Sequence, residues 1–119
     1  MPPDSLEHLR RQLAEFAAAR DWEQFHSPKN LAMALIAEAG ELIEHFQWLT
    51  EEQSRALTPD KQEHVALELA DILLYLVRLA DRLGVDMIAA AERKIAINAQ
   101  RYPADKVRGD ARRAAEYEP

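Results

Sequence analysis

An apolar run in the second half of the chain, residues 66–80, most constrains how the protein can fold. The run reads ALELADILLYLVRLA, and its apolar side chains fall on more than one face of a helix. A helix that is apolar nearly all round needs burial on several sides. Strand-like alternation is absent, and the apolar period is helical almost throughout the chain. We therefore expect an all-α, antiparallel four-helix bundle that a second subunit completes.

Local start signals divide the chain into its helices. Asp4 and Glu7 resemble a capping box ahead of the first helix. The second helix is expected to begin at Ser-Pro (27–28) and the third helix at Thr-Pro (58–59). A side-chain hydroxyl is favoured at the N-cap, and proline is favoured at the first helical position. Asp86 caps the fourth helix. The expected helices span about residues 5–20, 28–49, 59–83 and 87–102, with a polar loop at 50–60.

The composition excludes several classes of protein. A length of 119 residues suits one domain, which we place at residues 1–103, followed by a charged tail at 104–119. A hydrophobic fraction of 48% argues against disorder, and a net charge of −6 argues against binding to duplex nucleic acid. No apolar stretch is long enough to cross a membrane, and no signal peptide is expected. The lack of cysteine excludes thiolate chemistry and fits a reducing cytoplasm.

Two pairs of acidic residues lie inside otherwise apolar helices. Glu38 and Glu41 lie on one face of the second helix, and Glu68 and Asp71 lie on one face of the third. If the second helix ends near residue 49, both pairs lie about 8–12 residues from the connecting loop. An antiparallel hairpin then brings the four carboxylates to the same level. A single pair of this kind is usually a solvated surface, but two pairs in register among aliphatic side chains favour a site.

A divalent cation would stabilise such a cluster. Burying several like charges is costly, and carboxylate oxygens are the ligands that Mg²⁺ or Mn²⁺ prefers. The sequence therefore predicts a Mg²⁺ site, with Mn²⁺ as the other suitable ion, held by Glu38, Glu41, Glu68 and Asp71. His45 and His64 are more typical of a rim than of ligands. Lys94, Asn98 and Arg101 share a face of the fourth helix, either as a solvated stripe or as a phosphate-binding row, which the spacing leaves open.

These motifs resemble the all-α nucleoside triphosphate pyrophosphohydrolases, the MazG-like superfamily. The ExxE and ExxD motifs read Glu38-Ala-Gly-Glu41 and Glu68-Leu-Ala-Asp71. DWEQFH at residues 21–26 and FQW at residues 46–48 are similar to the dCTP pyrophosphatase branch. This resemblance covers roughly residues 6 to 109. One departure is Leu13, which stands where animal members carry a histidine in the pocket.

The resemblance implies Mg²⁺-dependent hydrolysis of a nucleoside triphosphate, dCTP or a modified pyrimidine deoxynucleotide, to the monophosphate and pyrophosphate. It implies that the four acids hold the metal, that Trp22, His26 and Trp48 lie around the base, and that Tyr75 helps to line the substrate site. It places Lys29 and Asn30 in a substrate-contacting segment, and it implies assembly as a dimer or as a tetramer of two dimers. It also implies that Lys94 and Asn98 bind phosphates, and that the role is to clean the nucleotide pool. Two other classes remain open, a non-enzymatic helical assembly module and a carboxylate-bridged iron or manganese oxidase.

Overall fold

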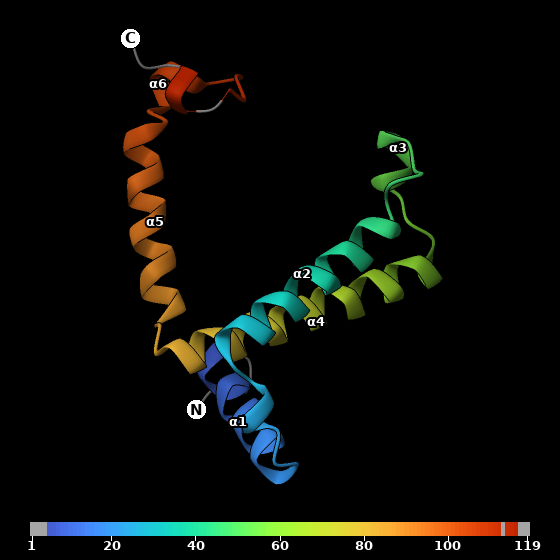
Figure 1. Cartoon of the computed structure of the whole chain (residues 1–119). Coiled ribbons are helices and arrows are strands. Elements are labelled where there is room, and N and C mark those ends of the chain that lie inside the picture. Colours follow the sequence, from blue (N-terminus) through green and yellow to red (C-terminus); the bar gives the residue numbers. More distant parts are fainter. Residues whose placement is uncertain (1–4, 113, 117–119) are drawn as a thin grey trace. The chain divides into compact units, whose positions relative to one another are not determined.

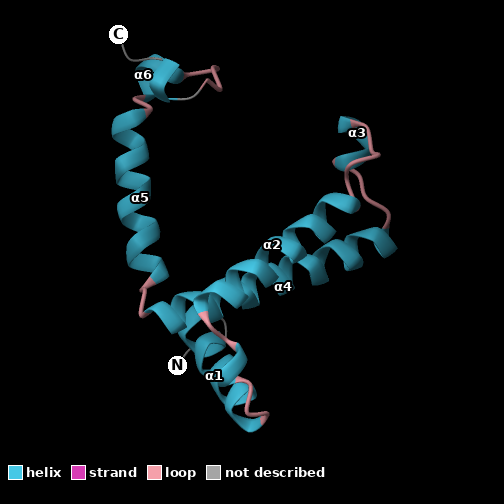
Figure 2. Ribbon diagram, viewed as in Figure 1, coloured by secondary structure: helices cyan, strands magenta, loops and turns pink. Residues whose placement is uncertain are grey.

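The structure is a computed structural model that describes residues 5–112 and 114–116. The described residues contain helices and loops but no strand, so the predicted all-α class is confirmed (Figure 2). The elements are α1 (Leu6–Ala19), η1 (Glu23–Phe25), α2 (Pro28–Glu44), α3 (Glu51–Ser54), α4 (Pro59–Leu83), α5 (Met87–Arg101), α6 (Ala104–Val107) and η2 (Ala114–Glu116). Packing within the chain forms two units, Met1–Val85 and Asp86–Pro119.

The first unit is built on a helical hairpin. Helices α2 and α4 run antiparallel and side by side, and α1 also packs against α4 (Figure 1). The buried apolar side chains come from all three helices, so α1, α2 and α4 share one small core. These side chains are Ala17, Leu31, Val65, Val77 and Ala80. The hairpin thus places the middle of α2 against the middle of α4, where both acidic pairs lie.

The predicted helix starts are confirmed at three positions. The side chains of Ser27, Thr58 and Asp86 each accept a hydrogen bond from a backbone N–H three residues ahead, at 3.1, 3.3 and 3.0 Å. The predicted cap of the first helix was wrong, because Ser5 is the N-cap of α1 and its side chain accepts from the backbone of His8. Asp4 lies outside the described residues. Glu7 instead accepts a hydrogen bond from Arg10 Nε at 2.7 Å.

Helix α2 ends five residues earlier than the sequence predicted. Its last residue is Glu44, and residues 45–49 form turns instead of a further helical turn. The apolar side chains of Phe46 and Leu49 continue the helical period, which is why the sequence overestimated the helix length. The expected loop at 50–60 contains α3, which begins with a capping box between Thr50 and Gln53.

Helix α4 ends where a glycine permits a left-handed residue. Gly84 has a φ of 68°, and its backbone N–H donates back to the last turn of α4. Residues with a side chain adopt this conformation at a cost of roughly 1 kcal/mol, so glycine is favoured there. This stop fixes the C-terminal end of the helix that carries Glu68 and Asp71.

The second unit contains α5, α6 and η2. The sequence placed the boundary between domain and tail at residue 103, and that division stays a prediction, as does the count of four bundled helices. In the ranges that the structure describes, no helix is both long and apolar enough to cross a membrane.

Candidate active site

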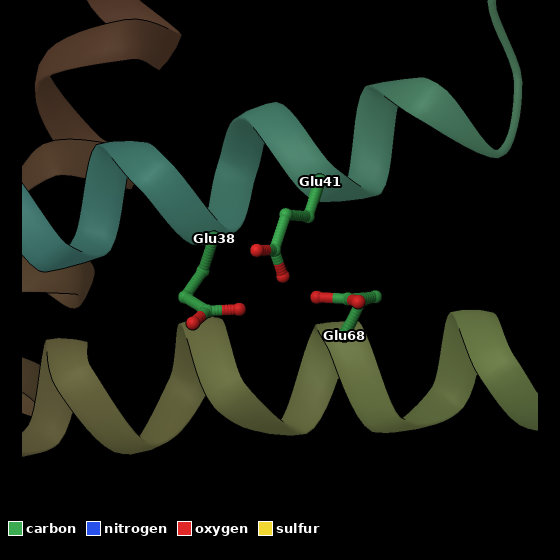
Figure 3. Close-up of side chains that lie close together, drawn as sticks. All are labelled: Glu38, Glu41 and Glu68. Carbon is green, nitrogen blue, oxygen red and sulfur yellow. The ribbon is translucent and has the colours of Figure 1, made fainter.

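Three glutamates from two helices meet between α2 and α4. Glu38 and Glu41 come from α2 and Glu68 from α4, and one oxygen from each carboxylate lies within 4.8 Å of the other two. Figure 3 shows the three side chains pointing into the space between the helices. The antiparallel hairpin therefore brings together three of the four predicted acids.

Asp71 lies one helical turn from Glu68 and outside this closest group. Its charge nevertheless acts on Glu38, and both residues line the same neighbouring cavity. Asp71 therefore faces the carboxylate cluster from the side of the cavity. It is also exposed, whereas Glu38 and Glu68 are partly buried.

The cluster is electrostatically strained without a cation. Two of its oxygens, Oε2 of Glu38 and Oε2 of Glu68, are buried and have no hydrogen-bond partner. Burial and the negative charges of Glu41 and Asp71 together raise the pKa of Glu38 from 4.5 to about 7, with burial as the largest cause. Hard oxygen donors with unused lone pairs suit Mg²⁺ or Mn²⁺, so the three glutamates fit a divalent cation.

His45 is the nearest nitrogen ligand candidate. Its Nε2 lies 3.9 Å from Glu68 Oε1, and its ring centroid lies 6.2 Å from that of His64. Neither histidine belongs to the metal-compatible cluster in the part of the chain described here. His45 thus lies beside Glu68, and His64 lies next to His45.

A cavity of about 190 Å³ opens beside the cluster. Its lining combines apolar and aromatic side chains with two of the acids and two basic groups. The lining residues are Leu13, Phe16, Trp22, His26, Leu31, Glu38, Asp71, Leu74, Tyr75 and Arg78. Three of the residues predicted to contact the substrate, Trp22, His26 and Tyr75, thus lie together beside the acids. Leu13 lies in the same cavity.

The connector between α1 and α2 positions the aromatic residues of the cavity. The Trp22 ring packs edge-on against Phe16 at 5.7 Å and against His26 at 6.3 Å, measured between ring centroids. The Asn30 side chain donates to the backbone oxygen of Phe25 at 3.0 Å, which closes the connector onto the start of α2. The local sequence therefore holds Trp22 and His26 against the hairpin.

Three predicted substrate residues of the first unit do not line this cavity, and two more lie in the second unit. Lys29 and Asn30 are exposed at the start of α2, and Trp48 is 86% exposed in the turn after α2. Lys94 and Asn98 are exposed on α5, in the second unit. The proposed roles of all five in substrate binding stay predictions.

Arg78 is a cavity residue that the sequence analysis missed. The sequence showed it only as a charge that interrupts an apolar run. A single arginine within such a run is a usable signal, because a buried guanidinium needs partners. Its partners are not predictable from spacing, since His26 is 52 residues away.

Comparison with known proteins identifies the family of this chain. The family model described as the MazG-like family matches residues 34–116, a range that includes all four acids. The chain belongs to the MazG-like family. The expectation drawn from the ExxE and ExxD motifs is therefore confirmed at the level of the family.

Relatives of this MazG-like chain include named pyrophosphatases. Human dCTP pyrophosphatase 1 is 49% identical over 117 residues, which cover 97% of this chain and 69% of the human protein. The mouse protein of the same name is 50% identical over 112 residues, or 92% of this chain and 66% of the mouse protein. The chain thus spans about two thirds of the length of these relatives. A crystal structure of a pyrophosphatase from Archaeoglobus fulgidus superposes with a TM-score of 0.78 at 37% identity, covering 82% of this chain and 91% of that one.

Proposed function

We propose that this protein is a Mg²⁺-dependent nucleoside triphosphate pyrophosphohydrolase. Its substrate would be dCTP or a modified pyrimidine deoxynucleoside triphosphate, and its products the monophosphate and pyrophosphate. The observation that carries the proposal is the cluster of Glu38, Glu41 and Glu68 beside an aromatic cavity. The names of the relatives, dCTP pyrophosphatase 1 and pyrophosphatase, support the reaction class.

The acids would hold the cation. Glu38, Glu41 and Glu68 offer converging oxygens, and Asp71 faces the same space from the cavity side. A bound Mg²⁺ supplies positive charge to phosphate oxygens and lowers the pKa of a bound water. Because the acids stand on two packed helices, their carboxylates are held in place before a substrate binds. Glu41 is the most exposed of the three glutamates and therefore the one that solvent reaches most easily.

The cavity would hold the base. Its volume of about 190 Å³ is smaller than the roughly 300–1,000 Å³ of pockets for drug-sized ligands, so it suits one ring of a nucleotide. Trp22 and Tyr75 provide aromatic surface, and stacking of a base on an aromatic ring contributes about 1–3 kcal/mol. The adjacency of cavity and acids would leave the phosphates near the carboxylate cluster.

A panel of nucleotides tests this function. The protein is incubated with ribo- and deoxynucleoside triphosphates and Mg²⁺, and the products are separated. We expect a monophosphate and pyrophosphate, with a pyrimidine deoxynucleotide turned over fastest. A diphosphate with orthophosphate would contradict the proposal. A helical assembly module would hydrolyse none of them, and an oxidase would require ligands from His45 or His64.

We also propose that the chain forms a homodimer or homotetramer. Several large apolar side chains of α2 and α4 are exposed, among them Ile36 at 71% and Ile43 at 59%. Large apolar side chains left exposed in such number favour burial against a second copy of the chain. Light scattering after size exclusion should give two or four times the chain mass of 13.6 kDa. A mass of one chain would contradict this assembly.

A further inference from the structure

Arg78 is a buried charged residue at the wall of the cavity. Its side chain is only 5% exposed, and it is the one buried polar or charged residue in the described ranges. Its Nη2 atom is buried without a hydrogen-bond partner. A buried guanidinium is costly unless its contacts compensate the lost hydration. The contacts that Arg78 does make are therefore informative about its role.

Arg78 bridges a histidine of the cavity and an aspartate of its own helix. Its Nε donates to Nδ1 of His26 at 3.1 Å, and its Nη1 donates to Oδ2 of Asp81 at 3.4 Å. The other oxygen of Asp81 accepts from Arg10 Nη1 of α1 at 3.3 Å. Asp81 is thus held from two helices and orients Arg78 toward His26.

The contact with Arg78 determines where the proton of His26 lies. A guanidinium only donates hydrogen bonds, so Nδ1 of His26 must be the acceptor. A neutral imidazole has one acceptor nitrogen and one N–H, so the proton is on Nε2. A charged imidazolium would point an N–H at the N–H of Arg78 and would lose this hydrogen bond.

The electrostatic surroundings of His26 act in the same direction. Burial lowers the pKa of His26, and the charges of Arg78 and Arg82 lower it further, while Glu23 opposes them. The hydrogen bond of Arg82 goes to the main chain of His26, where its Nε donates to the carbonyl oxygen at 3.1 Å. Both charge and hydrogen bonding therefore favour the neutral ring.

We propose that Arg78 is a positioning residue that keeps His26 neutral, with its proton on Nε2, so that the ring offers one N–H donor to an acceptor atom of the base. Pyrimidine rings carry such acceptors as carbonyl oxygens or an unprotonated ring nitrogen. The base-binding part of this inference rests on the proposed function, because it assigns the cavity to the base. The protonation of His26 stands on the contacts within the chain alone.

NMR of histidine ring nitrogens tests the first part on the unmodified protein. The chain has four histidines, and His26→Asn assigns the signals of His26 by their loss. At pH 7 we expect the Nε2–H tautomer, seen as a protonated Nε2 and an unprotonated Nδ1. A protonated Nδ1, or a charged ring at this pH, would overturn the proposal without any further variant.

Variants of the two arginines separate hydrogen bonding from charge. Arg78→Met should give a mixture of tautomers, whereas Arg78→Lys, which keeps a donor and a charge, should retain much of the Nε2–H form. Arg82→Met is the matched control, because it removes a cation near His26 whose hydrogen bond goes to the main chain and not to the ring. An equal change of tautomer in Arg78→Met and Arg82→Met would overturn the positioning role. If Arg78→Met does not fold, the lysine variant decides, and a mixed tautomer there counts against the proposal.

Kinetics test the second part. Arg78→Met should raise KM for the preferred triphosphate about 3- to 10-fold, the effect of one weakened hydrogen bond, with kcat changed less than about twofold. In a protein that already carries His26→Asn, Arg78→Met should raise KM by less than about a further twofold. Additive effects, or an unchanged KM, would overturn the link to the base. If the unmodified protein hydrolyses no triphosphate, the proposed function fails, while the tautomer result still stands.

Discussion

Glu38 is expected to set the pH range in which the carboxylate cluster binds a cation. A carboxylate must lose its proton to become a metal ligand. Because burial and the neighbouring acids raise the pKa of Glu38 to about 7, this group competes with protons near neutral pH. About one tenth of the Glu38 carboxyl is ionised at pH 6 and about nine tenths at pH 8. We therefore expect the apparent Kd for Mn²⁺ to be about tenfold higher at pH 6 than at pH 8.

The assay is a titration of the metal-free protein with Mn²⁺ at pH 6, 7 and 8 and constant ionic strength, with free Mn²⁺ followed by electron paramagnetic resonance. Glu38→Gln is the matched variant, since it removes the proton and the charge but keeps the shape. We expect Glu38→Gln to bind Mn²⁺ more weakly than the unmodified protein at every pH. Its apparent Kd should change less than about twofold from pH 6 to pH 8.

His45 is a neighbour of the cluster, with its Nε2 3.9 Å from Glu68 Oε1, and we do not expect it to bind the cation. His45→Asn should leave most of the tenfold change in place. The reasoning is refuted if the affinity of the unmodified protein is flat from pH 6 to 8, or if Glu38→Gln keeps the full slope.

Three further substitutions test the site and the core. Asp71→Asn should lower turnover more than about 100-fold and leave the helicity unchanged. Substituting a residue that only hydrogen-bonds to a metal ligand already costs about 10- to 100-fold, and a ligand should cost more. Normal turnover would show that Asp71 is not part of the site. Leu31→Ala should lower the free energy of unfolding by about 2–5 kcal/mol, because the Leu31 side chain is only 2% exposed. Ile36→Ala on the same helix should lower it far less, because Ile36 is 71% exposed. Equal losses for the two variants in chemical denaturation would contradict the described core. Trp48→Ala should mainly raise KM for the triphosphate, by the roughly 1–3 kcal/mol of one stacking contact; an unchanged KM would place Trp48 outside the base site.

Local signals predicted the helices well where they begin and less well where they end. The hydroxyl and carboxyl caps at Ser27, Thr58 and Asp86 act within three residues, so the sequence shows them directly. The end of α2 has no comparable signal, because the apolar period continues into the turn after Glu44. The capping box that opens α3, Thr50 with Gln53, was visible in the sequence and was overlooked.

The acid cluster was predictable because a hairpin has simple geometry. Two pairs at similar distances from one loop were expected to meet when the helices are antiparallel. Three of the acids do meet, although α2 ends at Glu44 and not near residue 49. Asp71 lines the cavity and is not part of the closest group of carboxylates. The spacing of residues along a helix does not show this difference in side-chain direction. The link from Arg78 to His26 joins distant parts of the chain, so it required the packed structure.

The position of bond cleavage tests the central claim most directly. The protein is allowed to hydrolyse dCTP with Mg²⁺ in water enriched in ¹⁸O, and the products are weighed by mass spectrometry. Attack of water on the α-phosphorus predicts that one ¹⁸O enters dCMP and that the released pyrophosphate is unlabelled. Label in the pyrophosphate, or formation of dCDP with labelled orthophosphate, would contradict the account.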